Sequence, residues 1–442
     1  MIITRFAPSP TGFLHIGNVR TAIINYLYSK KRVGKVILRF DDTDIKRGKK
    51  EYADTILQDM VWLGLEYDEF YKQSKRLELY EKKKNELIAS GKLYPCYETE
   101  EEIGLKRKMA NSRGVPFIYD REALHLLPQQ IKDYEAQGRK PHYRFLLDDK
   151  EIRWEDKIKG TVRFKERTFS DPVLIREDGS PLYTFCSVVD DVEMGITDIV
   201  RGEDHVTNTA VQIQIFEALG GKVPNFAHLT TIKTSSGKMS KRIGGFSIKD
   251  LREGGFEAQA VLNMLSQLGI GKIENYNDFQ EILKDFDISN YAKAPANYII
   301  SDLEKLNEKF LHEANFKRIK TRLKEIGLEK IDEKFWNSVK RNLQKLEEIK
   351  DWWKICKEEI RYNNKYEDRD FLKDSASVLP NEKFTEKSWN KWIASIKDVT
   401  GRASKGLFMP LRLALTAQQH GPELQKLLPL INREEVIKRL LN

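Results

Sequence analysis

Phe6-Ala-Pro-Ser-Pro-Thr-Gly-Phe-Leu-His-Ile-Gly-Asn18 joins the first expected strand of the chain to its first expected helix. Ile2, Ile3 and Phe6 predict a short buried strand, and apolar residues over 19–27 recur at helical spacing. Gly12 and Gly17 let the backbone pass close to a ligand, and free N–H groups at a helix N-terminus bind phosphate. The stretch therefore predicts either a phosphate-binding turn or an ordinary strand–helix connection.

A second apolar run, Val-Ile-Leu-Arg-Phe at residues 36–40, ends at the acidic residues Asp41, Asp42 and Asp44. Together with the preceding strand and helix it completes a βαβ unit. Such a unit predicts a parallel sheet that binds its ligand at the carboxyl ends of the strands. Asp41 would then lie at the same edge as His15. Acidic residues after a strand also serve as plain loop or capping residues, so both interpretations stay open.

A polar loop far along the chain, Thr234-Ser-Ser-Gly-Lys-Met-Ser-Lys-Arg242, carries three cations within five residues. Taken alone, it is typical of a solvated basic loop. Paired with His15-Ile16-Gly17-Asn18, it resembles the two signature motifs of class I aminoacyl-tRNA synthetases, HIGH and KMSKS. Four flanking segments narrow the resemblance to glutamyl-tRNA synthetases of the bacterial type: Arg5-Phe-Ala-Pro-Ser-Pro-Thr-Gly12, Asp41-Asp-Thr-Asp44, Val200-Arg-Gly-Glu-Asp-His205 and Leu407-Phe-Met-Pro-Leu-Arg-Leu-Ala-Leu415.

The composition indicates a cytoplasmic protein with several domains. A chain of 442 residues with 40% hydrophobic residues predicts about two to four domains. No run approaches the roughly 18 apolar residues of a membrane helix, so we expect no membrane contact. The first motif begins at Arg5 and leaves no room for a removable leader, so we expect no signal peptide. The scattered Cys96, Cys186 and Cys356 indicate a reducing compartment. The net charge of +9 suits a polyanionic partner.

We expect an α/β Rossmann-type catalytic domain with an α+β insertion, followed by an all-α C-terminal half. Periodicity predicts helices at 51–63, 74–90, 208–219 and 258–268, antiparallel strands at 143–147, 151–154 and 161–165, and a return to the sheet over 180–191 and 196–201. The resemblance then implies four parts: a catalytic domain at 1–94 and 181–245, an acceptor-end-binding insertion at 95–180, a helical stem-contact region at 246–319 and a helical anticodon-binding domain at 320–442.

Apolar residues of the C-terminal half fall on one helical stripe, which comprises Phe335, Val339, Leu343, Leu346, Trp353 and Cys356. We interpret this stripe as core. Trp389 and Trp392 could either pack inside the protein or stack on nucleic-acid bases, and we expect packing.

The resemblance implies that the chain activates glutamate with ATP and transfers it to the 3′ end of a tRNA. It assigns catalysis to His15, Lys238 and Lys241. The implied ATP contacts are Pro8, Gly12, His15, Gly17, Asn18, Lys238, Met239, Ser240, Lys241 and Arg242. The implied glutamate contacts are Arg5, Ser9, Asp41, Tyr183 and Arg201, with Arg201 on the side-chain carboxylate. A guanidinium suits that role because it binds a carboxylate in a bidentate manner.

Two positions depart from the family pattern. Asp41 stands where relatives usually carry Glu, so the carboxylate that would meet the substrate amino group is one methylene shorter. Several relatives bind a structural zinc through cysteines clustered just after the position of Cys96, but this chain has only Cys96 there. Because structural zinc takes about four ligands, we expect no zinc. The implied cofactor is Mg²⁺ with ATP, and the implied partner of the monomer is tRNA-Glu, with tRNA-Gln as a second candidate.

Several other functions remain open at this point. A glutaminyl-tRNA synthetase would have a β-barrel C-terminal half, and an enzyme that glutamylates a modified tRNA base would lack that half. A small-molecule nucleotidyltransferase uses a similar phosphate-binding turn but binds no tRNA. A non-catalytic RNA-binding module would have no reason to combine His15, Lys238 and Lys241.

Overall fold

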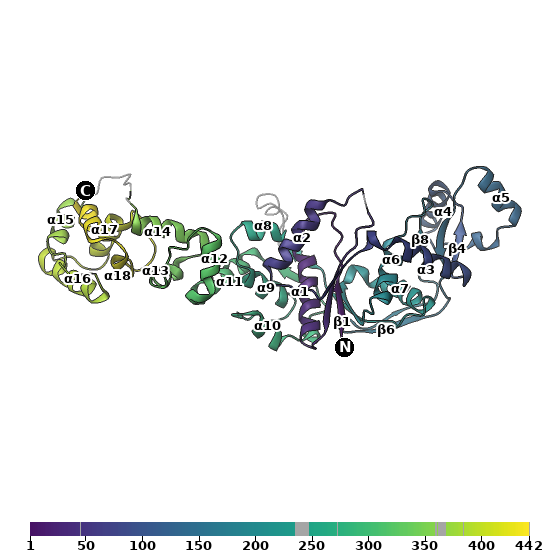
Figure 1. The fold of residues 1–442 in the computed structure, drawn as a ribbon, viewed down its shortest axis with the longest axis horizontal. Helices are drawn as coiled ribbons and strands as arrows, with labels where there is room; N and C mark the ends of the chain where they lie inside the picture. Colours follow the sequence, from purple (N-terminus) through teal and green to yellow (C-terminus); the bar gives the residue numbers. More distant parts are fainter. Residues whose placement is uncertain are drawn as a thin grey trace. The chain divides into compact units, whose positions relative to one another are not determined.

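The computed structural model describes residues 1–44, 46–234, 247–271, 273–358, 360, 368–382 and 384–441. These residues fall into two compact units (Figure 1). Unit 1 comprises Met1–Arg252 and Leu262–Ile299, and unit 2 comprises Glu253–Val261 and Ile300–Asn442. No helix of the described ranges is long and apolar enough to cross a membrane.

Unit 1 contains the expected βαβ unit. Strands β1 (Ile3–Phe6), β2 (Lys35–Phe40) and β3 (Glu69–Lys72) form a parallel sheet in the order β1-β2-β3. Helix α1 (Ile16–Lys30) connects β1 to β2. Residues Val36 to Phe40 are all buried, as in a parallel strand that is covered on both faces. The prediction of a parallel sheet is confirmed.

A second group of strands extends this layer on the other side of β1. Strand β9 (Asp198–Gly202) lies beside β1, because the N–H of Thr197 donates to the Ile3 carbonyl at 3.0 Å. Strand β10 (Asn225–Leu229) then pairs with β9 in parallel. The side chain of Asn25 on α1 donates to the Val200 carbonyl at 2.9 Å, so α1 packs across both β1 and β9.

The strands inside residues 95–180 divide between two sheets. Strands β4 (Leu93–Cys96), β5 (His142–Phe145) and β8 (Val173–Ile175) form a separate antiparallel sheet. Strands β6 (Ile152–Asp156) and β7 (Gly160–Phe164) form a hairpin, whose β6 pairs in parallel with β10 at Asp156 and Phe226. Part of the expected insertion thus contributes an edge to the sheet of β9 and β10.

Helices appear where the periodicity predicts them, with one correction. Helices α2 (Lys50–Trp62), α3 (Leu77–Ala89), α7 (Val206–Ala218) and α9 (Ala258–Gln267) match the predicted ranges. Residues 183–191, which we expected to return to the sheet, instead belong to helix α6 (Tyr183–Glu193). Phe185, Val188 and Val189 are buried at helical spacing, so packing overrides the strand preference of valine.

The remaining elements of unit 1 are short and connect these layers. They are α4 (Glu100–Ser112), α5 (Pro128–Ala136), β11 (Ile232–Thr234), α8 (Ile248–Glu253), α10 (Phe279–Asp285) and β12 (Ala296–Tyr298), with β11 and β12 paired in parallel.

Unit 2 is helical throughout its described elements. Its α-helices are α11 (Ile300–Glu313), α12 (Phe316–Glu325), α13 (Glu333–Val339), α14 (Ile349–Lys357), α15 (Arg369–Ser377), α16 (Glu386–Thr400), α17 (Ser404–Thr416), α18 (Leu424–Leu427) and α19 (Arg433–Leu441). The predicted apolar stripe belongs to their shared core, and Trp389 and Trp392 are buried in it as expected.

Trp392→Ala should strongly destabilise unit 2. The Trp392 side chain is fully buried, and its Nε1–H donates to the Ser375 carbonyl at 2.8 Å. Removing a buried tryptophan typically costs about 3–5 kcal/mol, and the carbonyl would lose its partner. Urea denaturation followed by circular dichroism at 222 nm measures the loss. Val399→Ala, at a 55% exposed position of the same helix, should change stability by less than about 0.5 kcal/mol. Equal effects of the two substitutions would contradict the assigned core.

Candidate active site

A cavity of about 610 Å³ opens where β1 and β9 end, at the N-terminus of α1. Seven of the predicted site residues line it: Arg5, Pro8, His15, Gly17, Asn18, Tyr183 and Arg201. Ser9, Gly12 and Asp41, although described, are not among the lining residues. The sequence interpretation had not assigned several other residues of the wall to the site, among them Arg20, Thr21, Glu203, Asp204, Thr230, Thr231 and Thr234.

His15 caps the helix that begins at the cavity. Its Nδ1 accepts a hydrogen bond from the N–H of Gly17 at 3.1 Å, and its own N–H donates to Oδ1 of Asn18 at 3.4 Å. Partial burial lowers the pKa of His15, so the ring is neutral at pH 7. Because Nδ1 accepts, the proton of the neutral ring sits on Nε2 and is available to a ligand. A side chain at Gly17 would bring its Cβ to 2.9 Å from the His15 ring, so the ring would have to leave its capping position.

The second motif, Lys238 to Arg242, lies outside the described residues. The described residues on either side of 235–246 lie at the cavity or at the first motif. Thr234 lines the cavity, and Ser247 forms a β-bridge with His15. The N–H of Ile248 also donates to the Leu14 carbonyl at 2.9 Å. The chain therefore leaves the described structure at the cavity and re-enters it beside the helix N-terminus that His15 caps.

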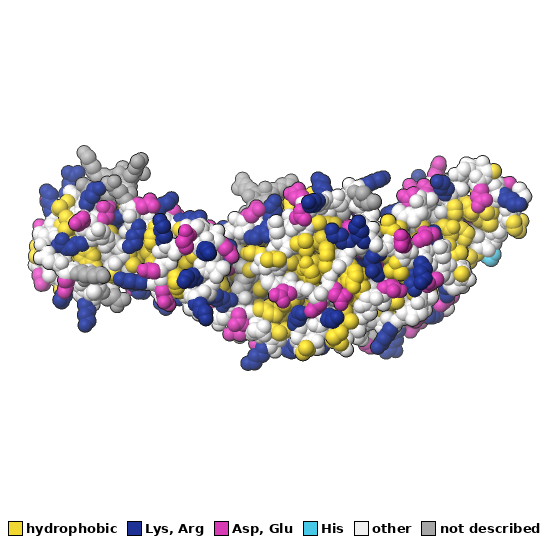
Figure 2. All heavy atoms as spheres, in the orientation of Figure 1, with side chains coloured by type: hydrophobic (Ala, Val, Ile, Leu, Met, Phe, Trp, Pro, Cys, Tyr) yellow, Lys and Arg dark blue, Asp and Glu magenta, His cyan; other side chains and the backbone are white. Residues whose placement is uncertain are grey.

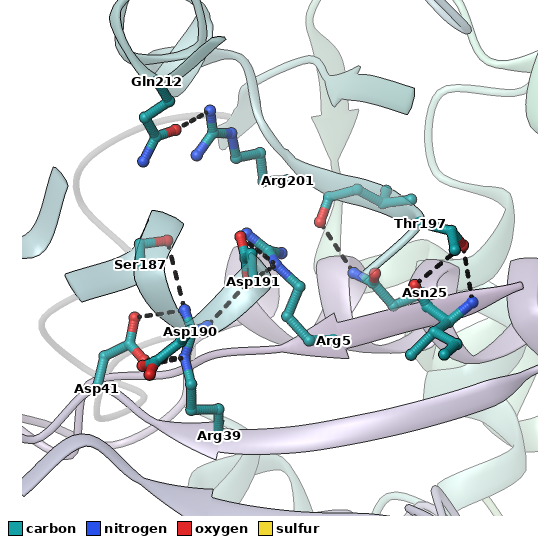
Figure 3. A network of polar contacts seen from close by, with 12 residues as sticks. Arg5, Asn25, Arg39, Asp41, Ser187, Asp190, Asp191, Thr197, Arg201 and Gln212 are labelled. Carbon is teal, nitrogen blue, oxygen red and sulfur yellow. Dashed lines mark hydrogen bonds and ion pairs between the residues drawn. The ribbon is translucent and has the colours of Figure 1, made fainter. Parts of the chain in front are cut away.

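Arg201, at the end of β9, is a buried cation whose described hydrogen-bond partners are all uncharged. Its Nη2 donates to Oγ1 of Thr209 at 2.6 Å. The same nitrogen donates to Oε1 of Gln212 at 2.7 Å (Figure 3). Its Nη1 lies 3.5 Å from the Tyr183 hydroxyl, at the cavity wall. Only 4% of the residue is exposed, and burial lowers its pKa. Among the described carboxylates none forms an ion pair with this guanidinium, so the site is prepared for an anion from outside.

Several other charged side chains near the cavity form one network of opposite charges (Figure 3). Asp191 accepts hydrogen bonds from Nε of Arg5 at 3.2 Å and from Nη1 of Arg39 at 2.8 Å. Nε of Arg39 also donates to Asp41 at 2.7 Å and lies 3.7 Å from Asp190. Asp190 in turn accepts from Arg76 at 2.7 Å. Three arginines thus face three aspartates. Two further buried arginines of the cavity wall lie outside this network: Arg201, and Arg20, whose Nη1 donates to the Thr230 carbonyl at 2.7 Å and which pairs with no described carboxylate.

Asp41 belongs to this network rather than to the lining of the cavity. Both of its carboxylate oxygens accept hydrogen bonds from Arg39, and burial raises its pKa to about 6. The expected contact between Asp41 and a substrate amino group stays a prediction. Arg39 was not predicted as a site residue, although one signal was present: it interrupts an apolar strand and lies two residues before Asp41, on the same face.

Among the described residues of 95–180, two groups of potential metal ligands share Glu98, and the second consists of Glu98, Asp120 and Glu122. Cys96, Glu98 and His142 place three ligand atoms within 4.8 Å of one another. Burial raises the pKa of Cys96 to about 12 and lowers that of His142 to about 4. The Tyr119 hydroxyl already donates to Glu98 at 2.6 Å. Structural zinc takes about four ligands and binds cysteine as thiolate, so the absence of zinc stays our expectation.

Comparisons with known proteins agree along the whole chain. Residues 1–305 match the family of class I tRNA synthetases (E and Q), catalytic domain, and residues 298–442 match an anticodon binding domain. Glutamate–tRNA ligase 1 of Rickettsia massiliae is 51% identical over 441 residues, which cover 99% of both chains. The corresponding protein of Rickettsia prowazekii is 50% identical over 443 residues, covering 100% of this chain and 99% of its own.

Solved structures give the same result. A glutamate–tRNA ligase from Elizabethkingia meningosepticum, crystallised in complex with its amino acid, superposes with a TM-score of 0.84 at 27% identity, covering 99% of this chain and 98% of its own. The enzyme from Elizabethkingia anophelis superposes equally well at 26% identity with the same coverage. The chain therefore belongs to the class I aminoacyl-tRNA synthetases, in the family of the glutamate–tRNA ligases.

Proposed function

We propose that the chain attaches glutamate to tRNA-Glu in two steps, with Arg201 as the residue that recognises the amino acid. The observation that carries the assignment is the buried guanidinium of Arg201, which has only neutral partners among the described residues and faces the cavity. The glutamate side chain supplies the missing negative charge. Glutamine cannot supply it, and hydrogen bonds to charged groups contribute roughly 1.5–3 kcal/mol each, so the neutral amide is disfavoured.

The first step joins glutamate to ATP. The α-carboxylate of glutamate attacks the α-phosphorus, pyrophosphate leaves, and glutamyl-adenylate forms. His15 donates from Nε2 to the phosphates, alongside the N-terminal N–H groups of α1. Lys238 and Lys241 stabilise the negative charge that grows on the leaving pyrophosphate. In the second step the terminal ribose hydroxyl of the tRNA attacks the acyl carbon of the mixed anhydride, so that the glutamyl ester forms and AMP leaves. Neither step requires a protein nucleophile, so catalysis rests on positioning and charge.

A Mg²⁺ ion bound together with ATP would supply further positive charge at the phosphates. The carboxylates in the cavity wall are Glu203 and Asp204. Glu203 is already engaged, since it pairs with Lys159 and accepts the N–H of Thr231 at 2.6 Å. We therefore assign most of the Mg²⁺ ligands to phosphate oxygens and water, which is the usual arrangement for this ion.

The parts of the chain outside the cavity are proposed to hold the tRNA. Residues 95–180 would bind the acceptor end, 246–319 the stem and 320–442 the anticodon. On the face drawn in Figure 2, Lys and Arg side chains are interspersed with acidic ones over both units, and the net charge is +9. Long-range attraction for the polyanion would therefore come from the whole chain. We place the enzyme in the cytoplasm as a monomer, and its three cysteines are free and buried.

A charging assay tests the function directly. The protein is incubated with ATP, Mg²⁺ and labelled glutamate, with tRNA-Glu and tRNA-Gln transcripts in parallel. We expect label on tRNA-Glu. Additional label on tRNA-Gln would mean that the cell must convert the product by a later amidation. Labelling of neither transcript by folded protein would refute the proposed function.

Arg201→Ala should damage glutamate recognition selectively. Losing hydrogen bonds from a charged group costs roughly 1.5–3 kcal/mol each, so KM for glutamate should rise at least about tenfold. KM for ATP, measured in the same assay, serves as the internal control and should change little. A similar rise in both constants would remove Arg201 from the amino-acid pocket.

Lys241→Ala should lower the rate of adenylate formation by roughly 10²–10³, the usual loss for one preorganised donor in a transition state. Pre-steady-state measurement of pyrophosphate release checks this. Lys249→Ala is the matched control, because Lys249 carries the same charge eight residues later in the chain, on α8, where its Nζ lies 4.7 Å from the centre of the Phe13 ring. A loss below threefold for Lys241→Ala would exclude its assigned role.

A further inference from the structure

Arg201 has one more hydrogen-bond partner, which lies on the neighbouring strand. His228 on β10 is the direct register partner of Arg201 on β9. Nε of Arg201 lies 3.4 Å from Nε2 of His228, and this imidazole is completely buried. The remaining N–H groups of Arg201 go to Thr209, Gln212 and the Tyr183 side of the cavity. His228 therefore completes the set of acceptors that surrounds the guanidinium.

Asp156 holds the opposite edge of the His228 ring. It ends strand β6, and its Oδ2 lies 2.5 Å from Nδ1 of His228. Its Oδ1 accepts the backbone N–H groups of Ile158, Lys159 and His228 at 3.0, 2.9 and 3.2 Å. Burial opposes ionisation of Asp156, but these hydrogen bonds outweigh it and lower the pKa of the carboxyl. Asp156 is thus a carboxylate, which can only accept.

The tautomer of His228 follows from this contact. A carboxylate beside Nδ1 requires a proton on Nδ1. Burial lowers the pKa of His228, so the ring is neutral and its Nε2 carries a lone pair. That lone pair faces Nε–H of Arg201 and the hydroxyl of Thr209, 2.9 Å away. The other tautomer would instead point an N–H at the N–H of Arg201, which is repulsive. A carboxylate that fixes the tautomer of a histidine is a familiar device in enzyme sites.

We propose that Asp156 and His228 are positioning residues that orient the Arg201 guanidinium, with Nη1 toward the cavity, and thereby contribute to the selection of glutamate. This inference rests on the proposed function of Arg201. It gives the β6–β7 hairpin a role in the amino-acid pocket, although the hairpin lies within the stretch expected to bind the tRNA acceptor end. The order of contacts is Asp156, His228, Arg201 and then the substrate carboxylate.

Two substitutions at one position separate the hydrogen bond from simple packing. His228→Asn removes the acceptor at the Nε2 position, whereas the longer His228→Gln can present an amide oxygen there. ATP–pyrophosphate exchange, run with tRNA-Glu present, gives KM for glutamate and for ATP. Losing one hydrogen bond to a charged group is worth about tenfold, so His228→Asn should raise KM for glutamate about tenfold. KM for ATP should stay within twofold, and His228→Gln should restore most of the loss.

Asp156→Asn provides an independent variant with nearly the same shape, and it should lower kcat/KM for glutamate relative to that for glutamine.

The dependence on Arg201 is tested in a double variant. If His228 acts through Arg201, His228→Asn should change kcat/KM for glutamate by less than twofold in the Arg201→Ala background. Thermal melting of each variant shows whether it is folded. A variant that is unfolded is left out, and the comparison then rests on the remaining substitutions at His228 and Asp156.

Three results would overturn the inference: an unchanged KM for glutamate in folded His228→Asn and Asp156→Asn, equal changes in the two Michaelis constants, or a full effect of His228→Asn without Arg201. A wild-type protein that charges no tRNA-Glu would instead refute the proposed function. Normal wild-type charging together with normal variants would refute the positioning role alone.

Discussion

The guanidinium of Arg39 is fully buried between Asp41, Asp190 and Asp191. This ion cluster constrains how the elements around the cavity pack against one another. An unpaired buried charge costs several kcal/mol, so strand β2 and helix α6 must meet even though Arg39 and Asp191 are 152 residues apart in the chain. Asp191 also holds Arg5, which places the end of β1 in the same cluster. The residues that must surround the substrates are therefore brought together by charges that neutralise one another.

Arg201 differs from the arginines of this cluster, because no described carboxylate pairs with it. Its described partners are hydroxyl, amide and imidazole groups, so its charge remains available to a ligand while its geometry is fixed. Preorganised donors of this kind need little rearrangement when the substrate arrives. The relatives that share about half of their residues with the chain are glutamate–tRNA ligases, and a buried arginine without a described carboxylate partner in the pocket wall suits an acidic amino acid.

Local residue patterns predicted most helices and strands. They failed where tertiary packing determines the secondary structure or the pairing of a strand. The parallel unit of β1, α1 and β2, the hairpin of β6 and β7 and the helical second unit all follow from periodicity. Helix α6 was misread because its paired valines favour a strand locally, whereas its buried face has helical spacing. The partner of β6 was also unpredictable, since alternation shows that a strand is half buried but not which strand it joins.

The sequence by itself identified the family and predicted the chemistry, through two motifs at His15 and Lys238, arginines at positions 5 and 201, and a βαβ unit whose strands end at one edge. Only the tertiary structure decided how those groups are supported. Two of the supporting contacts join distant parts of the chain: the pairing of Arg39 with Asp191, and the line from Asp156 through His228 to Arg201. The third, the capping of α1 by His15, depends on side-chain geometry. Periodicity is a local property, whereas the partners of a buried charge are fixed by desolvation across the whole fold.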